Sequence, residues 1–200
     1  MEESENIKII VLGETGTGKT NLINAYFDKP FNKDNFTTTA PEFFQKELKV
    51  DGCNCLVGLW DTAGQEKYRS LSKVIMNGSK IVVLVYDVTN KKTFEELNFW
   101  VKSVEEVLGK DPILGIAANK IDLFEEQVVE KEEGEKYAND IGALFAETSA
   151  KEDQKGFQDF IYKLLQKYIQ KNGLGTKNVD NGRILLNKNK INTKKKKKKC

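Results

Sequence analysis

One eight-residue stretch near the N-terminus, GETGTGKT at residues 13–20, constrains this chain more than any other feature. It follows the apolar run IKIIVL, which predicts a buried strand, and precedes NLINAYF, whose apolar side chains recur at helical spacing. The stretch fits G-x-x-x-x-G-K-[ST], the phosphate-binding loop, whose glycines let backbone N–H groups close around a phosphate. An accidental match in a glycine-rich turn is the alternative, and the strand-loop-helix context argues against it. We therefore expect a nucleoside triphosphate here, with Lys19 near the outer phosphates and the Thr20 hydroxyl as a Mg²⁺ ligand.

Apolar runs and turn signals predict an alternation of strands and helices along the rest of the chain. Two strands around Asp51-Gly52 form a hairpin signal, after a threonine-rich loop that runs from Pro30 to Pro41. The runs IVVLVYD and ILGIAAN, at residues 81–87 and 113–119, are typical of strands covered on both faces. A short strand is expected at 143–147. This alternation predicts an α/β fold with a mostly parallel sheet and helices on both faces.

Helical spacing predicts three further helices. The first carries Phe94, Leu97, Val101, Val104 and Leu108 on one face, the second covers about 130–140, and the last follows the final strand. The last helix has an apolar face made of Phe157, Phe160, Ile161, Leu164, Leu165 and Tyr168. After Asn172-Gly173 the pattern dissolves into polar residues, so we expect one domain at 1–172 and a flexible tail at 173–200.

A second motif, WDTAGQE at residues 60–66, ends a predicted strand. In phosphate-loop proteins a carboxylate in this place holds Mg²⁺ through water, which is the role expected for Asp61. Gly64 can donate its N–H to a γ-phosphate, and Gln65 is well placed to orient an attacking water. An ordinary strand-to-turn junction would explain DTAG alone, but not DTAG following a phosphate loop.

A third motif, NKID at residues 119–122, ends another apolar strand and indicates which base is bound. Guanine presents N1–H and an exocyclic amine on one edge, and the Asp122 carboxylate can accept both. Adenine offers no such pair. Asn119 and the aliphatic stem of Lys120 are expected to complete the pocket.

The fourth motif, ETSAK at residues 147–151, also follows a strand, so the Ala150 N–H is placed to meet guanine O6. Sites at the carboxyl ends of parallel strands converge where ligands bind in open α/β folds. The four motifs together favour guanine. A phosphate-loop kinase or ATPase is the rival enzyme class, which NKID and ETSAK disfavour, and a GTP-binding scaffold without hydrolysis is the rival outside enzymology.

The set GETGTGKT, DTAGQE, NKID and ETSAK resembles the Ras superfamily of small GTPases over residues 7 to about 171. The segments KYRSLS at 67–72, LVYDVT at 84–89 and LNFW at 97–100 are similar to the Rab branch. The resemblance implies a P-loop NTPase small G domain with a six-stranded sheet, five helices and two nucleotide-sensitive switch segments. It also implies a GTP/GDP switch that hydrolyses GTP with Mg²⁺ and regulates vesicle traffic through effectors.

The resemblance, with the motifs, assigns residue roles. Catalysis is expected to rest on Lys19, Gly64 and Gln65. Mg²⁺ is expected at Thr20, Asp61 and Thr38. Thr38 is the position reached by counting without gaps from Lys19 and back from Asp61 in the family pattern, although Thr37 and Thr39 flank it. The nucleotide-binding set is Glu14, Thr15, Gly16, Thr17, Gly18, Lys19, Thr20, Asn21, Phe31, Thr38, Asp61, Gly64, Asn119, Lys120, Asp122, Ser149, Ala150 and Lys151.

Partner surfaces follow from the same resemblance. An exchange factor, a GTPase-activating protein and effectors are expected to contact the switch residues Thr38, Phe43, Trp60 and Tyr68. The chain departs from the usual Rab pattern in the segment TTAPEFF and in Ile75-Met76, which replaces a tyrosine pair, so effector choice is open. No arginine lies in residues 28–43, so hydrolysis is expected to be slow unless a partner supplies one.

The chain finishes with six lysines, Lys194 to Lys199, followed by Cys200. Eight of the 32 basic residues lie in 188–200 with no acid, which leaves 24 against 30 acidic residues in the rest. A basic arm on an acidic body predicts an anionic surface as the partner of the arm. The Rab resemblance implies a prenyl chain on Cys200, and one such chain plus the lysines would suffice for membrane attachment, so the cytoplasmic face of an intracellular membrane is the expected location.

Alternatives for the tail are a palmitoylated or truncated end, a solvated arm, or the nuclear address of another signalling GTPase. No apolar run approaches the roughly 20 residues of a membrane-spanning helix, and the acidic N-terminus lacks the basic start of a secretory signal. Three cysteines form no disulfide framework, and we interpret Cys53 and Cys55 as surface or half-buried thiols.

Overall fold

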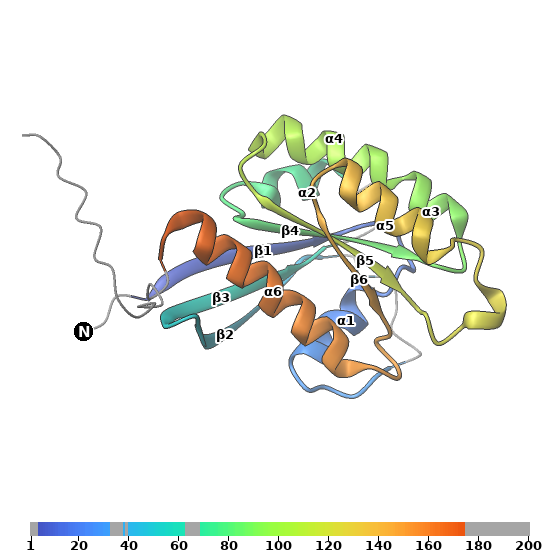
Figure 1. Ribbon diagram of the computed structural model, residues 1–200, viewed down its shortest axis with the longest axis horizontal. Coiled ribbons are helices and arrows are strands. Elements are labelled where there is room, and N and C mark those ends of the chain that lie inside the picture. The colour runs from blue at the N-terminus through green and yellow to red at the C-terminus, as the bar shows by residue number, and fades with distance from the viewer. Residues whose placement is uncertain (1–3, 33–37, 39, 63–68, 175–200) are drawn as a thin grey trace, which may run out of the picture.

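A single six-stranded sheet organises the part of the chain that the computed structural model describes, residues 4–32, 38, 40–62 and 69–174 (Figure 1). Its strand order is β2-β3-β1-β4-β5-β6, and every neighbouring pair is parallel except β2 with β3. The strands are β1 (Glu5–Leu12), β2 (Glu42–Val50), β3 (Cys53–Asp61), β4 (Ile81–Asp87), β5 (Ile113–Asn119) and β6 (Leu144–Thr148). The predicted six-stranded, mostly parallel sheet is confirmed.

Helices cover both faces of this sheet (Figure 1). They are α1 (Lys19–Tyr26), α2 (Arg69–Met76), α3 (Lys91–Glu95), α4 (Leu97–Leu108), the short 3-10 turn η2 (Phe124–Glu126), α5 (Lys131–Asp140) and α6 (Gln154–Asn172). Residues of α1 and α6 share one hydrophobic core, and residues of α2, α3, α4 and α5 share the other. The predicted α/β architecture with two covered faces is therefore present.

The alternation of side chains along β1 shows how one strand serves both cores. Ile7, Ile9 and Val11 are buried in the core under α1 and α6, whereas Ile10 and Leu12 are buried in the core on the opposite face. Successive side chains of a strand point to opposite faces, so a central strand of a covered sheet must be apolar at nearly every position.

The hairpin expected at Asp51-Gly52 joins β2 to β3 in antiparallel register. Asp51 has φ 47° and Gly52 has φ 83°, so both residues of the turn are left-handed. That is the geometry of a two-residue primed turn, whose twist matches the twist of the flanking strands. The turn lies at the opposite end of β3 from Asp61.

Three sequence-based expectations need correction. The helix expected to run from Phe94 to Leu108 is two helices, α3 and α4, which join at Glu96. Apolar spacing of three and four continues across the join, so the sequence pattern did not show it. The expected strand at 143–147 is shifted by one residue, and Cys55 is fully buried beneath α6 rather than half-exposed.

The C-terminal helix α6 ends at Asn172, with Gly173 as a left-handed cap at φ 66°. Apart from residues 173 and 174, the tail expected at 173–200 lies outside the described residues. Within the described ranges, no helix is both long and apolar enough to cross a membrane.

Gly115 in β5 gives a test of core packing. A Cβ built there would lie 2.8 Å from Phe160 Cζ and 2.9 Å from Leu164 Cδ1, and both side chains are buried. Gly115→Ala should lower the free energy of unfolding by about 1–3 kcal/mol because the core is already filled. Chemical denaturation measures this.

The control is the double variant that combines Gly115→Ala with Leu164→Ala. Leu164→Ala alone should cost about 2–5 kcal/mol, and adding Gly115→Ala to it should cost less than Gly115→Ala costs by itself. Strictly additive losses would contradict the packing contact.

Candidate functional site

The phosphate loop connects β1 to α1 through two glycines that cannot be replaced without strain. Gly13 has φ 142° and Gly18 has φ 94°. A Cβ on Gly13 would lie 2.2 Å from the Val85 carbonyl oxygen, and one on Gly18 would lie 2.3 Å from Asn119 Nδ2. The loop is therefore packed directly against β4 and β5, and only glycine allows that approach.

Lys19 begins α1 and turns its ammonium back onto the loop. Its Nζ donates to the carbonyl oxygens of Gly13 and Glu14, both at 2.9 Å. The side chain is 5% exposed, and burial lowers the pKa of Lys19 to about 8, against the opposing charges of Asp61 and Glu14. A buried cation whose hydrogen bonds go to carbonyl oxygens favours a further anion at its side.

Thr20, Thr38 and Asp61 meet at one point, although three separate segments carry them. Thr20 Oγ1 donates to Asp61 Oδ2 at 2.7 Å, and the Oγ1 atoms of Thr20 and Thr38 are 2.9 Å apart. Three oxygen donors of this kind suit a hard cation such as Mg²⁺. The structure thus brings together the three residues predicted as magnesium ligands.

Asp61 carries the strongest sign that this cluster fits a cation. The residue is 0% exposed, and its Oδ1 has no hydrogen-bond partner among the described residues. Burial raises the pKa of its carboxyl group, against the lowering effects of the Thr20 hydrogen bond and the Lys19 charge. An unpaired oxygen on a buried carboxyl is costly unless a cation or donor meets it.

The NKID segment is fastened to the phosphate loop. Asn119 Nδ2 donates to the Thr17 carbonyl oxygen at 2.8 Å, and Thr148 Oγ1 donates to Asn119 Oδ1 at 3.2 Å. Asn119 is 1% exposed, so both ends of its amide are used inside the protein. It was predicted as part of the base pocket, and here it is a brace between the loop and two strands.

The carboxylate predicted to recognise guanine is held by the ETSAK segment. Asp122 Oδ1 accepts a hydrogen bond from Ser149 Oγ at 2.6 Å, and Lys151 Nζ lies 4.0 Å from Asp122 Oδ2. Ser149 Oγ also accepts from the Glu152 N–H at 3.0 Å. The third and fourth motifs therefore converge, as the sequence predicted, and the adjoining Ala150 is buried.

Lys120 has a partner that the sequence analysis missed. Its Nζ is 2.5 Å from Asp87 Oδ2, and its backbone has φ 72°, a left-handed value that is rare outside glycine. Asp87 ends β4, pairs in register with Asn119, and also accepts from the N–H and hydroxyl of Thr89. The end of a parallel strand next to NKID was the signal that could have found Asp87.

The other residues predicted to bind the nucleotide lie in the phosphate loop, at the start of α1 and after α1. Thr15 and Gly16 are exposed at the tip of the loop, and Thr17 Oγ1 donates inside it to the Glu14 carbonyl at 2.9 Å. Asn21 Nδ2 donates to the Asn32 carbonyl at 3.1 Å, whereas Phe31 is 39% exposed. The predicted roles of Gly64, Gln65, Tyr68, Lys194 to Lys199 and Cys200 lie outside the described residues.

The two aromatic residues expected on a partner surface are neighbours. The Phe43 and Trp60 ring centroids are 5.0 Å apart, on opposed positions of β2 and β3. Phe43 is 49% exposed, which is unusual for a large aromatic side chain. Trp60 directly precedes Asp61, so the pair adjoins the cluster of Thr20, Thr38 and Asp61.

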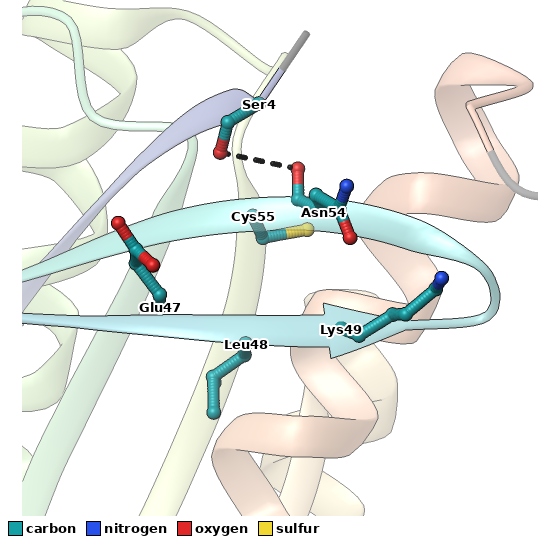
Figure 2. Close-up of a pocket in the computed structure, with 6 residues that line it drawn as sticks. All are labelled: Ser4, Glu47, Leu48, Lys49, Asn54 and Cys55. Atoms are coloured by element: carbon teal, nitrogen blue, oxygen red, sulfur yellow. Dashed lines mark hydrogen bonds between the residues drawn. The ribbon is translucent and has the colours of Figure 1, made fainter. Parts of the chain in front are cut away.

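A surface hollow of about 520 Å³ lies elsewhere, and Figure 2 shows its lining of Ser4, Glu47, Leu48, Lys49, Asn54 and Cys55. Ser4 precedes β1, and Asn54 is near the start of β3. The hollow is thus at the opposite end of these strands from Gly13 and Asp61. It is separate from the nucleotide site.

Asp61→Asn should stabilise the protein when no divalent cation is present. The neutral amide removes the penalty of a buried charge with an unpaired oxygen, so in EDTA the free energy of unfolding should rise by about 1–3 kcal/mol. Because burial raises the folded-state pKa of Asp61, wild-type stability falls as pH rises from the unfolded value of 3.8, and the variant's advantage should shrink in acid.

Urea denaturation in EDTA at several pH values measures this difference. Asp87→Asn is the matched control, because Asp87 is equally buried but fully paired, so its substitution should destabilise. Loss of stability in Asp61→Asn would contradict the assignment of an unsatisfied carboxylate.

Comparison with known proteins agrees with this geometry. The model of the Ras family matches residues 8–170. Mouse Rab-21 is 37% identical over 165 residues, which cover 82% of this chain and 74% of the relative. Rab-18 of Caenorhabditis elegans is 38% identical over 82% of this chain and 80% of the relative. Rat Rab-26 is 38% identical over 72% of this chain and 56% of the relative. This chain therefore belongs to the Ras family and is a Rab-like small GTPase.

Proposed function

We propose that this GTPase uses the site around Thr20 as a switch that controls membrane traffic through effectors. The observation that carries the proposal is that Thr20 Oγ1 contacts both Thr38 Oγ1, at 2.9 Å, and Asp61 Oδ2, at 2.7 Å. It joins the phosphate loop to the segment before β2 and to the end of β3. A ligand bound at this point can therefore change both segments at once.

The phosphate loop provides the anion site. Backbone N–H groups of residues 14–20 close around the phosphates, and the N-terminal end of α1 adds its positive potential. Lys19 would exchange the carbonyl oxygens of Gly13 and Glu14 for phosphate oxygens, whose negative charge would raise the pKa of its ammonium again.

Thr20, Thr38 and Asp61 are the residues that would hold Mg²⁺ with the nucleotide. The ion supplies neutralisation of charge on the β- and γ-phosphates. These residues would offer oxygen ligands to the ion, and the Asp61 Oδ1 atom, which has no partner among the described residues, would gain one directly or through water. The protein contributes the fixed positions of these oxygens.

Base recognition rests on Asp122, with Ser149 and Lys151 holding its carboxylate in place. Its Oδ2 is free of the Ser149 bond and can accept from the guanine N1–H and exocyclic amine. The aliphatic stem of Lys120, fixed by the ion pair with Asp87, forms one side of the base pocket. The buried Ala150 offers its N–H to guanine O6.

The switch follows from what distinguishes GTP from GDP. The γ-phosphate is the added contact that Thr38 and the Gly64 N–H would make, so GTP favours the conformation in which both segments are held. Gln65 orients the attacking water, and release of phosphate removes the contacts. Exchange factors, GTPase-activating proteins and effectors read the change at Thr38, Phe43, Trp60 and Tyr68.

The C-terminal segment supplies location in this proposal. Lysines near an anionic leaflet contribute about 1 kcal/mol each, and one lipid chain gives only reversible binding, so the two signals act together. Lys194 to Lys199 would contact the leaflet, and a lipid on Cys200 would enter it. The protein would then cycle between the cytosol and the cytoplasmic face of one membrane.

Gln65→Leu tests the assigned chemistry. The leucine cannot orient water, so single-turnover GTP hydrolysis should slow by tenfold or more, up to roughly 10²-fold. Affinity for GTP should stay within about twofold because no nucleotide contact is removed.

The matched control is Gln170→Leu, since Gln170 is exposed on α6 far along the chain from the site. It should hydrolyse GTP at the wild-type rate. A Gln65→Leu variant that also keeps the wild-type rate would refute the role given to Gln65.

A further inference from the structure

Lys8 occupies a position in β1 where its neighbours are apolar. Ile7 and Ile9 are fully buried on one face of the sheet, and Lys8 points to the other face together with Ile10. A lysine on a central strand must find partners for its ammonium or pay for leaving water. Burial does lower the pKa of Lys8, so its surroundings are partly dry.

The partners of Lys8 are at the C-terminal end of α2. Its Nζ donates to the Ile75 carbonyl oxygen at 2.5 Å and to the Asn77 carbonyl oxygen at 2.9 Å. The last carbonyls of a helix have no partner within the helix and carry its negative potential. Ile75 is in the last turn of α2 and Asn77 directly follows the helix, so Lys8 both caps the helix and holds it to the sheet.

Lys8 has a third contact, on the aromatic pair. Its Nζ is 4.9 Å from the Trp60 ring centroid, and the Trp60 ring is 5.0 Å from that of Phe43. A cation within about 6 Å of an indole ring is attracted to its face. The contacts therefore run without interruption from Phe43 through Trp60 and Lys8 to Ile75.

Packing supports the same grouping. Trp60 and Ile75 are both half-buried against the core that contains Met76, on the face of the sheet covered by α2. β1 and β3 pair in parallel with Lys8 opposite Gly58 and Ile10 opposite Trp60. Because Gly58 has no side chain, the space beside Lys8 stays open for the aromatic rings, and a Cβ there would lie 2.7 Å from Phe43.

We propose that Lys8 is a positioning residue that fixes the C-terminal end of α2 beside the Phe43–Trp60 pair. α2 follows the segment that contains Gly64 and Gln65, and Phe43 follows the segment that contains Thr38. The inference rests on the proposed function to the extent that these segments respond to the nucleotide. Lys8 then transmits a displacement of α2 to Trp60.

Lys8→Met tests this, because methionine keeps most of the stem and loses the ammonium. In GDP-loaded protein, amide hydrogen exchange in residues 74–78 should become about 5- to 30-fold faster. Exchange in β4, β5 and α6 should not change. The fluorescence emission of Trp60 should differ much less between the GDP and GTP-analogue forms than it does in wild type. The core residue Trp100 should give a constant background.

A kinetic readout separates positioning from nucleotide binding. Lys8 is five residues before Gly13 on a strand that rises about 3.3 Å per residue, so it does not reach the phosphates. In Lys8→Met we expect the GDP dissociation rate to stay within about twofold of the wild-type rate. Single-turnover GTP hydrolysis should slow by about 3- to 10-fold through displaced α2.

Lys80→Met is the matched control, because Lys80 is an exposed lysine beside Lys8, next to the start of β4. It should behave as wild type. Unchanged exchange and emission in Lys8→Met would overturn the proposal, as would faster exchange throughout the protein, which would mean a general structural role. Failure of the wild-type protein to hydrolyse GTP would instead refute the proposed function, since exchange at 74–78 is read without turnover.

Discussion

The site depends on one buried interaction, the hydrogen bond from Thr20 Oγ1 to Asp61 Oδ2 at 2.7 Å. Asp61 ends β3 with no exposed surface, and the described residues satisfy only one of its two carboxylate oxygens. A carboxyl group in that position is stable as an anion only beside a positive charge. Lys19 supplies part of that charge from within the loop, and a divalent cation would supply the rest. Burying the Asp61 carboxylate without a cation costs free energy, and binding a cation would relieve that cost. The buried carboxylate therefore favours cation binding.

The parallel sheet places the other functional groups around this centre. Asp87, Asn119 and Thr148 are opposite one another at the ends of β4, β5 and β6, so one row of the sheet joins three motifs. Asn119 extends this row to the phosphate loop through the Thr17 carbonyl. The segments predicted to bind the base and the phosphates are thus parts of a single hydrogen-bonded structure.

Local chemistry could be predicted from the sequence, and long-range pairing could not. The phosphate loop is encoded by glycines and one lysine within eight residues, and the hairpin turn is encoded by the two residues Asp51 and Gly52. Both features could therefore be predicted from the sequence. The brace made by Asn119 and the ion pair of Lys120 with Asp87 join residues that only the sheet register brings together. The contacts of Lys8 with α2 are of the same kind, since a lysine in an apolar strand does not reveal which carbonyls it meets. The separation of α3 from α4 was missed because apolar spacing continued through it.

The central claim of the proposed function is that the γ-phosphate keeps Thr38 at the cation site, so that Thr38 contributes to Mg²⁺ binding with GTP and not with GDP. The most direct test is the Mg²⁺ affinity of wild type and Thr38→Ala, each loaded with GDP and with a non-hydrolysable GTP analogue. The account predicts that wild type binds Mg²⁺ more tightly in the GTP-analogue form. It also predicts that Thr38→Ala lowers the Mg²⁺ affinity of the GTP-analogue form about tenfold, which is the effect of losing one oxygen contact. The Mg²⁺ affinity of the GDP form should not change. An equal loss in both forms, or no loss in either, would contradict it.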